Sequence, residues 1–172
     1  MKYGVFVGRF NPIHVGHEKV IDAMIKDVGI ENCRLFIGSS GKEITIRNLF
    51  TYEQRVKFIR AIYLEINIAP LPDFPTDGEW LTALDDLLKC SSFNPNDVYF
   101  YGGCKEDVEF FFEDNRKVTI LNRFDGSTPE ISATKIRDFL IGGNPIEKWI
   151  NPKICDQIKT EFTKNWNILR TR

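Results

Sequence analysis

The sequence of 172 residues has few histidines, no closely spaced cysteines and no excess of charge of either sign. Lysine and arginine total 23 and aspartate and glutamate total 24, so the formal net charge is −1. A dedicated nucleic-acid-binding protein usually has a strong basic excess, so this balance argues against a nucleic acid as the partner. The four cysteines, Cys33, Cys90, Cys104 and Cys155, do not have the spacing of a zinc site. We therefore expect buried thiols in a reducing, cytoplasmic setting.

Long apolar runs are missing as well. No stretch approaches the roughly 18 apolar residues that a membrane helix needs, so we expect no association with a membrane. The first residues lack the charged lead and cleavage site of a signal peptide. What is present is 42% hydrophobic and 27% charged residues, which is typical of a globular protein. The length predicts one domain over residues 1–172, since domains usually have about 100–200 residues.

Short apolar runs alternate with segments of helical periodicity. Helices are predicted at 17–27, 51–66, 80–88, 106–113 and 132–141, and strands at 2–7, 34–37, 98–101 and 118–121. The segment 68–74 contains Pro70 and Pro72, which predicts an edge strand or a loop. This alternation is typical of an α/β fold with a mainly parallel sheet.

Two sequence patterns predict where helices begin. Thr51 followed by Gln54 is a capping box. Asn151 is predicted to cap a last helix with Pro152 at its first position, because proline suits that position. Residues 144–172 are expected to form a helical appendage on the domain.

The segment from Gly8 to His17 follows the first predicted strand and leads into the first predicted helix. Ligands of open α/β sheets bind beyond the carboxyl ends of strands, where this loop must lie. The N–H groups at a helix N-terminus attract phosphate, and Gly8 and Gly16 permit a close approach. Both histidines of the chain, His14 and His17, lie here and can face one pocket. Arg9 alone could be an ordinary surface residue, but beside this turn it is a candidate phosphate ligand.

This segment matches the pattern G-x-F-x-P-x-H-x-G-H. It therefore resembles the signature of the nucleotidyltransferase superfamily, and a chance match at all fixed positions is on the order of one in a million. The resemblance implies a Rossmann-like, doubly wound parallel sheet of about five strands. It also implies that the histidines contact the triphosphate and the transition state, and that ATP is bound by Gly8, Arg9, Phe10, His14, Gly16 and His17.

A second segment, Ile131 to Arg137, resembles the superfamily pattern I-S-S-T-x-x-R, with Ala133 in place of one serine. Here again a helix N-terminus is predicted, which Ser132 can cap. By itself this is also an ordinary capped helix. Together with the first motif, the resemblance implies that Ser132, Thr134 and Arg137 bind the ATP phosphates and that Arg137 is catalytic.

Three further stretches resemble the archaeal-type nicotinamide mononucleotide (NMN) adenylyltransferases. Residues 6–12 are close to F-V-G-R-[FM]-Q-P, with Asn11 in place of glutamine. Residues 37–40 and 46–55 resemble I-G-S-A and I-R-[ND]-P-F-T-x-x-E-R, with Leu49 in place of proline and Gln54 in place of glutamate. Asp73 and Trp80 stand where that branch has an aspartate and, seven residues later, a tryptophan near the nicotinamide.

The resemblance implies that NMN is bound by three residues. Arg47 would reach the phosphates, Trp80 would stack on the nicotinamide ring, and Asp73 would accept from the carboxamide or balance the ring charge. A core position for Trp80 and a solvated loop carboxylate at Asp73 remain alternatives. Gly102 could let the adenine of ATP approach the backbone, although a plain turn explains it equally well.

The expected activity is the joining of NMN and ATP to give NAD and pyrophosphate by direct in-line attack. No cluster of carboxylates stands near the motifs, so no metal-binding residues are assigned and Mg²⁺ is expected to be held mainly by the substrate phosphates. A homo-oligomer is implied by the resemblance alone. Two alternatives remain: another superfamily transferase, such as a pantetheine-phosphate adenylyltransferase or a cytidylyltransferase, and a non-catalytic nucleotide-binding module.

Overall fold

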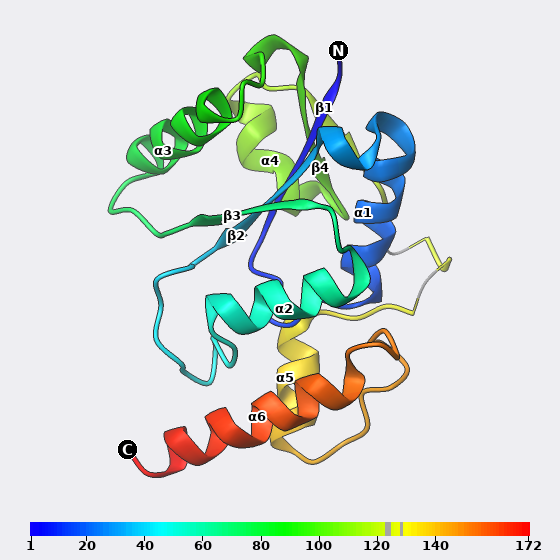
Figure 1. Ribbon diagram of the computed structural model, residues 1–172, viewed down its shortest axis with the longest axis vertical. Helices are drawn as coiled ribbons and strands as arrows, with labels where there is room; N and C mark the ends of the chain where they lie inside the picture. The colour runs from blue at the N-terminus through cyan, green and yellow to red at the C-terminus, as the bar shows by residue number, and fades with distance from the viewer. Residues whose placement is uncertain (123–124, 128) are drawn as a thin grey trace.

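The computed structural model describes residues 1–122, 125–127 and 129–172 (Figure 1). Its centre is a five-stranded sheet in the order β3-β2-β1-β4-β5, with every neighbouring pair parallel. The strands are β1 (Tyr3–Gly8), β2 (Cys33–Gly38), β3 (Asn67–Leu71), β4 (Val98–Gly102) and β5 (Val118–Ile120). The predicted Rossmann-like, doubly wound α/β class is confirmed.

The described residues form six α-helices, which pack with the sheet in two apolar clusters. One apolar cluster joins the sheet to α1 (Val15–Val28), α2 (Tyr52–Ile62), α5 (Ala133–Ile141) and α6 (Cys155–Arg170). The other joins it to α3 (Asp77–Cys90) and α4 (Lys105–Glu113). Adjacent strand residues serve opposite faces: Phe6 belongs to the first cluster and Val5 to the second. This is why the central strands are apolar runs rather than alternating patterns.

The direction of chain progression reverses at β1. From β1 the chain adds β2 and then β3 on one side, and it later adds β4 and β5 on the other. The loops that leave β1 and β4 therefore diverge above the carboxyl ends of the strands, which opens a crevice there. The segment from Gly8 to His17 crosses this crevice, as the sequence predicts.

The bounds of the helices α2 and α6 depart from the predictions for reasons that the structure shows. The helix α2 ends at Ile62, because Arg60 donates to the carbonyls of Leu64 and Ile66 in a turn, although Ile66 is still buried. The capping box of Thr51 and Gln54 at its start is confirmed.

The predicted cap at Asn151 is wrong. The helix α6 begins at Cys155, and Pro152 lies in the turn before it. The side chain of Asn151 accepts from the backbone N–H of Lys153 and donates to Glu18 on α1, so it is used for a turn and for docking. The predicted edge position of the proline-containing strand is confirmed, because β3 lies at the edge of the sheet. Over the described residues, no helix is long and apolar enough to cross a membrane.

Candidate active site

Two adjoining cavities lie beyond the carboxyl ends of β1, β2 and β4. One, of about 250 Å³, is lined by both histidines and the α5 N-terminus, and we name it the histidine cavity. The other, of about 580 Å³, contains Trp80 in its wall, and we name it the tryptophan cavity. Val7, Arg9 and Asp107 line both of them. A molecule that reaches from one cavity to the other must pass these three side chains.

The two histidines form the capping box of α1. The Nδ1 atom of His14 accepts from the backbone N–H of Gly16 at 3.1 Å, and the Nδ1 atom of His17 accepts from the backbone N–H of His14 at 3.3 Å. In a neutral imidazole whose Nδ1 is an acceptor, the proton is on Nε2. Local folding therefore fixes the tautomer, so that each ring has its N–H on the side away from the helix backbone.

Phe10 packs against the ring of His17. It is buried, has φ of 48°, and its ring lies 4.9 Å from the ring of His17 and 5.1 Å from that of Phe6. A Cβ on Gly8 would approach the Phe10 ring at 3.1 Å. Glycine at position 8 therefore makes room for this ring, which is a reason internal to the protein for the residue that the motif contains.

The second motif lies against the first. Ser132 caps α5 by accepting from the N–H of Lys135, and Thr134 and Arg137 line the histidine cavity. The guanidinium of Arg137 is buried and donates to the Asn11 carbonyl at 2.8 Å and to the Thr134 hydroxyl at 3.0 Å. Burial, followed by the nearby Arg9, lowers the pKa of Arg137. Two helix N-termini and two arginines thus surround one small cavity, which favours an anion.

Most of the residues predicted to bind ATP line the histidine cavity, but two do not. Gly16 is buried in the first turn of α1, where its N–H holds His14. Gly102 ends β4, and a Cβ there would lie 2.6 Å from the side chain of Val108. Glycine at position 102 is therefore needed for α4 to pack closely on the sheet, and its predicted contact with ATP stays a prediction.

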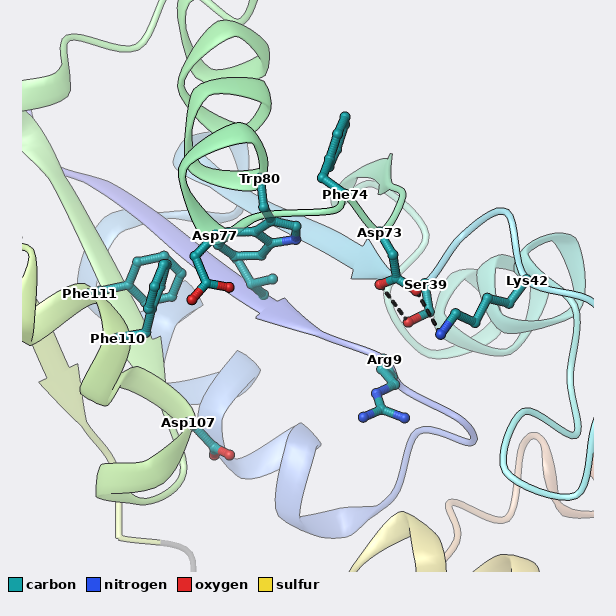
Figure 2. Close-up of a pocket in the computed structure, with 11 residues that line it drawn as sticks. Arg9, Ser39, Lys42, Asp73, Phe74, Asp77, Trp80, Asp107, Phe110 and Phe111 are labelled. Carbon is teal, nitrogen blue, oxygen red and sulfur yellow. Dashed lines mark hydrogen bonds and ion pairs between the residues drawn. The ribbon is translucent and has the colours of Figure 1, made fainter.

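The tryptophan cavity has an aromatic wall and charged groups around it (Figure 2). Trp80 packs against Phe110 and Phe111, with ring centroids 5.7 and 5.9 Å away, and it also lines the cavity. One part of the indole therefore belongs to the apolar core and another part faces the cavity, and its stacking on a nicotinamide ring stays a prediction. Figure 2 shows Asp77 below the indole, with Arg9 and Asp107 pointing toward the same space.

Asp73 lies at the other side of this cavity and is held in place. It accepts from the Ser39 hydroxyl at 3.0 Å and pairs with the Lys42 ammonium at 2.9 Å. The hydrogen bond from Lys42, with help from Ser39, lowers the pKa of Asp73. The carboxylate is thus charged and oriented although it lies in an exposed loop, and its contact with NMN stays a prediction.

Arg47 is not brought to either cavity. A tight turn, in which Thr45 and Asn48 exchange backbone hydrogen bonds, places it at an exposed tip. Asn48 is buried instead, where its side chain accepts from Asn11. The predicted reach of Arg47 to a phosphate has no support in this arrangement and stays a prediction.

Sequence reasoning missed Asp107 and Arg55. Asp107, in the first turn of α4, lines both cavities and accepts from the N–H of Gly103 at 2.9 Å. Its position soon after a strand that ends in two glycines was the available signal. Arg55 is fully buried on α2, and the available signal was its match to the arginine that ends the pattern I-R-[ND]-P-F-T-x-x-E-R.

The described residues do not offer a protein site for a metal ion. Among them, no three His, Cys, Asp or Glu side chains are grouped so that they could hold one. The carboxylates of the tryptophan cavity come from separate elements, and Asp73 is already paired with Lys42. A divalent ion at this site would need most of its ligands from elsewhere.

The sequence that forms these two cavities matches a known protein family. Residues 5–139 match the model of the family described as cytidylyltransferase-like. This chain belongs to the cytidylyltransferase-like family. The matched range begins in β1 and ends in α5, so it contains both motifs and all of the sheet except the first two residues of β1.

Relatives with curated names are similar over nearly the whole of this family member. A protein of Pyrococcus furiosus named nicotinamide-nucleotide adenylyltransferase is 28% identical over 167 residues, which cover 92% of this chain and 84% of that one. The resemblance to the archaeal-type enzymes is confirmed, and with it the prediction that the chain is of the nucleotidyltransferase type.

Solved structures confirm the fold. A bifunctional NMN adenylyltransferase/ADP-ribose pyrophosphatase from Francisella tularensis superposes with a TM-score of 0.79 at 22% identity, over 95% of this chain and 49% of that one. The chain thus spans about half the length of that protein. A second structure of it, complexed with AMP and a manganese ion, gives a TM-score of 0.74 at 23% identity, over 95% and 48% of the two chains.

Proposed function

We propose that the protein is an NMN adenylyltransferase, which joins NMN and ATP to give NAD and pyrophosphate. The observation that carries this proposal is the pair of adjoining cavities that share Arg9 and Asp107. One cavity suits a triphosphate, because helix N-termini and basic side chains surround it. The other suits a flat cationic ring, because it combines an indole with carboxylates. The names of the relatives support the same substrates.

In the proposed reaction, a phosphate oxygen of NMN attacks the α-phosphorus of ATP. A new P–O bond forms there as the bond from the α-phosphorus to the bridging oxygen breaks, and pyrophosphate leaves with that electron pair. The attacking phosphate is already an anion, so the reaction needs no general base. The contribution of the protein is then to hold the two anions in line and to offset the growing negative charge.

The residues of the histidine cavity fit that task. The Nε2–H groups of His14 and His17 are donors by virtue of their fixed tautomers, and Arg137 adds a fork of N–H groups that is held by Asn11 and Thr134. Donors that are already oriented stabilise a transition state without the cost of reorganising solvent. Arg9 lines both cavities, and in this proposal it would contact the phosphates of both substrates.

Mg²⁺ is proposed as the metal ion, carried by the triphosphate together with water. When bound it would offset charge on the phosphate oxygens. A homo-oligomeric state and a cytoplasmic location remain expectations from the resemblance and the composition.

An acceptor panel distinguishes this function from its rivals. The purified protein is given ATP or CTP with NMN, phosphopantetheine or choline phosphate, and pyrophosphate release is measured. We expect release with ATP and NMN and little with the other pairs. Release only with another acceptor or with CTP would identify a different transferase, and tight ATP binding without release would identify a binding module.

A further inference from the structure

A fully buried arginine lies behind the site and has no carboxylate partner among the described residues. Arg55, on the first turns of α2, has no exposed surface and forms no ion pair there. Burial lowers its pKa to about 10, which still leaves it charged at neutral pH. Placing an unpaired cation in a protein interior is costly, so hydrogen bonds must compensate.

Those hydrogen bonds go to backbone carbonyls of the loops that form the site. The Nη1 atom donates to the carbonyl of Arg9 at 2.8 Å and of Gly38 at 2.9 Å, and Nη2 donates to that of Ser39 at 3.1 Å. The Nε atom donates to the Thr51 carbonyl of its own helix at 3.3 Å. One guanidinium thus joins the ends of the two neighbouring strands β1 and β2.

The residues held in this way carry side chains of the site. Arg9 lines both cavities, and Ser39 lines the tryptophan cavity and donates to Asp73. Since Arg55 is buried, the carbonyls that point to it are directed into the interior and are kept from facing an anionic ligand. Arg55 itself lines neither cavity, so its effect on a ligand must pass through Arg9 and Ser39.

A second arginine holds the same loop two residues further on. Arg137 donates to the carbonyl of Asn11, while Arg55 donates to that of Arg9. Between them lies Phe10, whose φ of 48° is in the left-handed region that residues with a side chain rarely adopt. The two guanidinium groups therefore fix the carbonyls on either side of a strained residue.

We propose that Arg55 is a positioning residue, which sets the loop at Arg9 and the strand end at Ser39 so that both cavities have their ligand-binding shape. This inference rests on the proposed function for its kinetic consequence, although not for its structural one. Lysine cannot replace the guanidinium, because a single ammonium cannot donate in a fork to carbonyls on two strands.

The test compares Arg55→Lys with a matched control, Arg60→Lys. Arg60 lies on the same helix and also donates to two carbonyls, those of Leu64 and Ile66, away from both cavities. We expect Arg55→Lys to lower kcat/KM by about tenfold or more, because small misplacements of binding groups have large effects. The KM for NMN should rise more than that for ATP, since two held segments border the tryptophan cavity and one borders the histidine cavity. Arg60→Lys should leave both KM values within about twofold.

Hydrogen exchange gives a readout that does not need activity. We expect the amides at residues 9–11 and 38–40 to exchange faster in Arg55→Lys and to be unchanged in Arg60→Lys. If wild-type protein releases no pyrophosphate, the proposed function is wrong, and exchange alone then decides the role of Arg55. If Arg55→Lys folds, exchanges as the wild type does and keeps its KM values, the positioning role is refuted. Equal kinetic losses in both variants would also refute it, because they would show a general loss of stability.

Discussion

The imidazole of His14 stacks on that of His17, with ring centroids 3.8 Å apart and planes inclined by 27°. The backbone N–H of the first residue donates to Nδ1 of the second, so the ring pair is part of the helix cap. The residues proposed to act on the triphosphate are thus fixed by local folding before any ligand arrives. A side chain that serves as both cap and donor can be tested by separating the two roles.

Replacement of His17 should mainly affect kcat. We expect His17→Ala to lower kcat by about a hundredfold or more, the magnitude typical of removing an oriented donor to a transition state. Because alanine also removes the cap, His17→Gln is the informative companion, since glutamine at this position of a capping box can accept the same N–H. It should keep the thermal stability of the wild type and still lose activity. Near-normal kcat in a folded variant would contradict the role of His17.

Replacement of Trp80 should change the KM for one substrate more than the KM for the other. We expect Trp80→Ala to raise the KM for NMN much more than the KM for ATP, because the indole faces only the tryptophan cavity. Trp80→Phe retains a flat ring and should lie between wild type and alanine. Trp166→Ala, on the distant α6, controls for loss of an indole from the core. Equal changes in both KM values would show that the nicotinamide binds elsewhere.

The paired hydrogen bonds of the Arg137 guanidinium should contribute more to kcat than its positive charge does. In Arg137→Lys the charge remains, but the two hydrogen bonds to Asn11 and Thr134 cannot both form. We expect kcat to fall by about tenfold to a hundredfold, since lysine is a poor substitute where a planar fork is used. Lys135→Ala, at an exposed position of the same helix, should leave kcat unchanged. Wild-type turnover in Arg137→Lys would remove Arg137 from the proposed mechanism.

Glu18 should make stability depend on pH. Its Oε1 accepts from Asn151, whereas its buried Oε2 has no hydrogen-bond partner among the described residues. Burial raises the pKa of Glu18 above its usual value of 4.5, and Asp22 adds to this while Asn151 opposes it. A raised pKa in the folded state contributes stability that is full below 4.5 and is lost as pH rises through the folded value.

Glu18→Gln should remove that dependence. We expect the variant to gain in melting temperature relative to wild type between acidic and neutral pH, because a neutral amide costs less to bury than a carboxylate. Melting temperatures from pH 4 to 8 measure this, with the exposed Glu65→Gln as the control. A difference between Glu18→Gln and wild type that is constant with pH would contradict the expectation.

The fold was largely predictable because short apolar runs, which are typical of buried strands, alternate with segments of helical periodicity. Pro70 within β3 and Pro72 just after it indicated an edge strand or a loop, and Thr51 marked the start of α2. The end of α2 was not predictable, since Ile66 continues the apolar stripe although a turn held by Arg60 has ended the helix. The prediction that Asn151 caps the last helix failed for a similar reason. An asparagine that can cap a helix can equally close a turn and bind Glu18.

The candidate site was predictable where one short segment carries it. The cavity around His14 and His17 follows from a strand, a loop and a helix that are consecutive in the chain. Arg47 lies outside both cavities because its location depends on a turn between Thr45 and Asn48 that the motif does not encode, and its contact with a phosphate stays a prediction. Asp107 was missed because its contribution depends on how α4 packs against β4.

Formation of the dinucleotide tests the central proposal most directly. The purified protein is incubated with NMN, ATP and Mg²⁺, and NAD and pyrophosphate are both quantified over time. The account predicts that the two products appear in equal amounts and that His17→Gln suppresses both together. Binding of ATP and NMN without any NAD, in protein whose fold is intact, would contradict it.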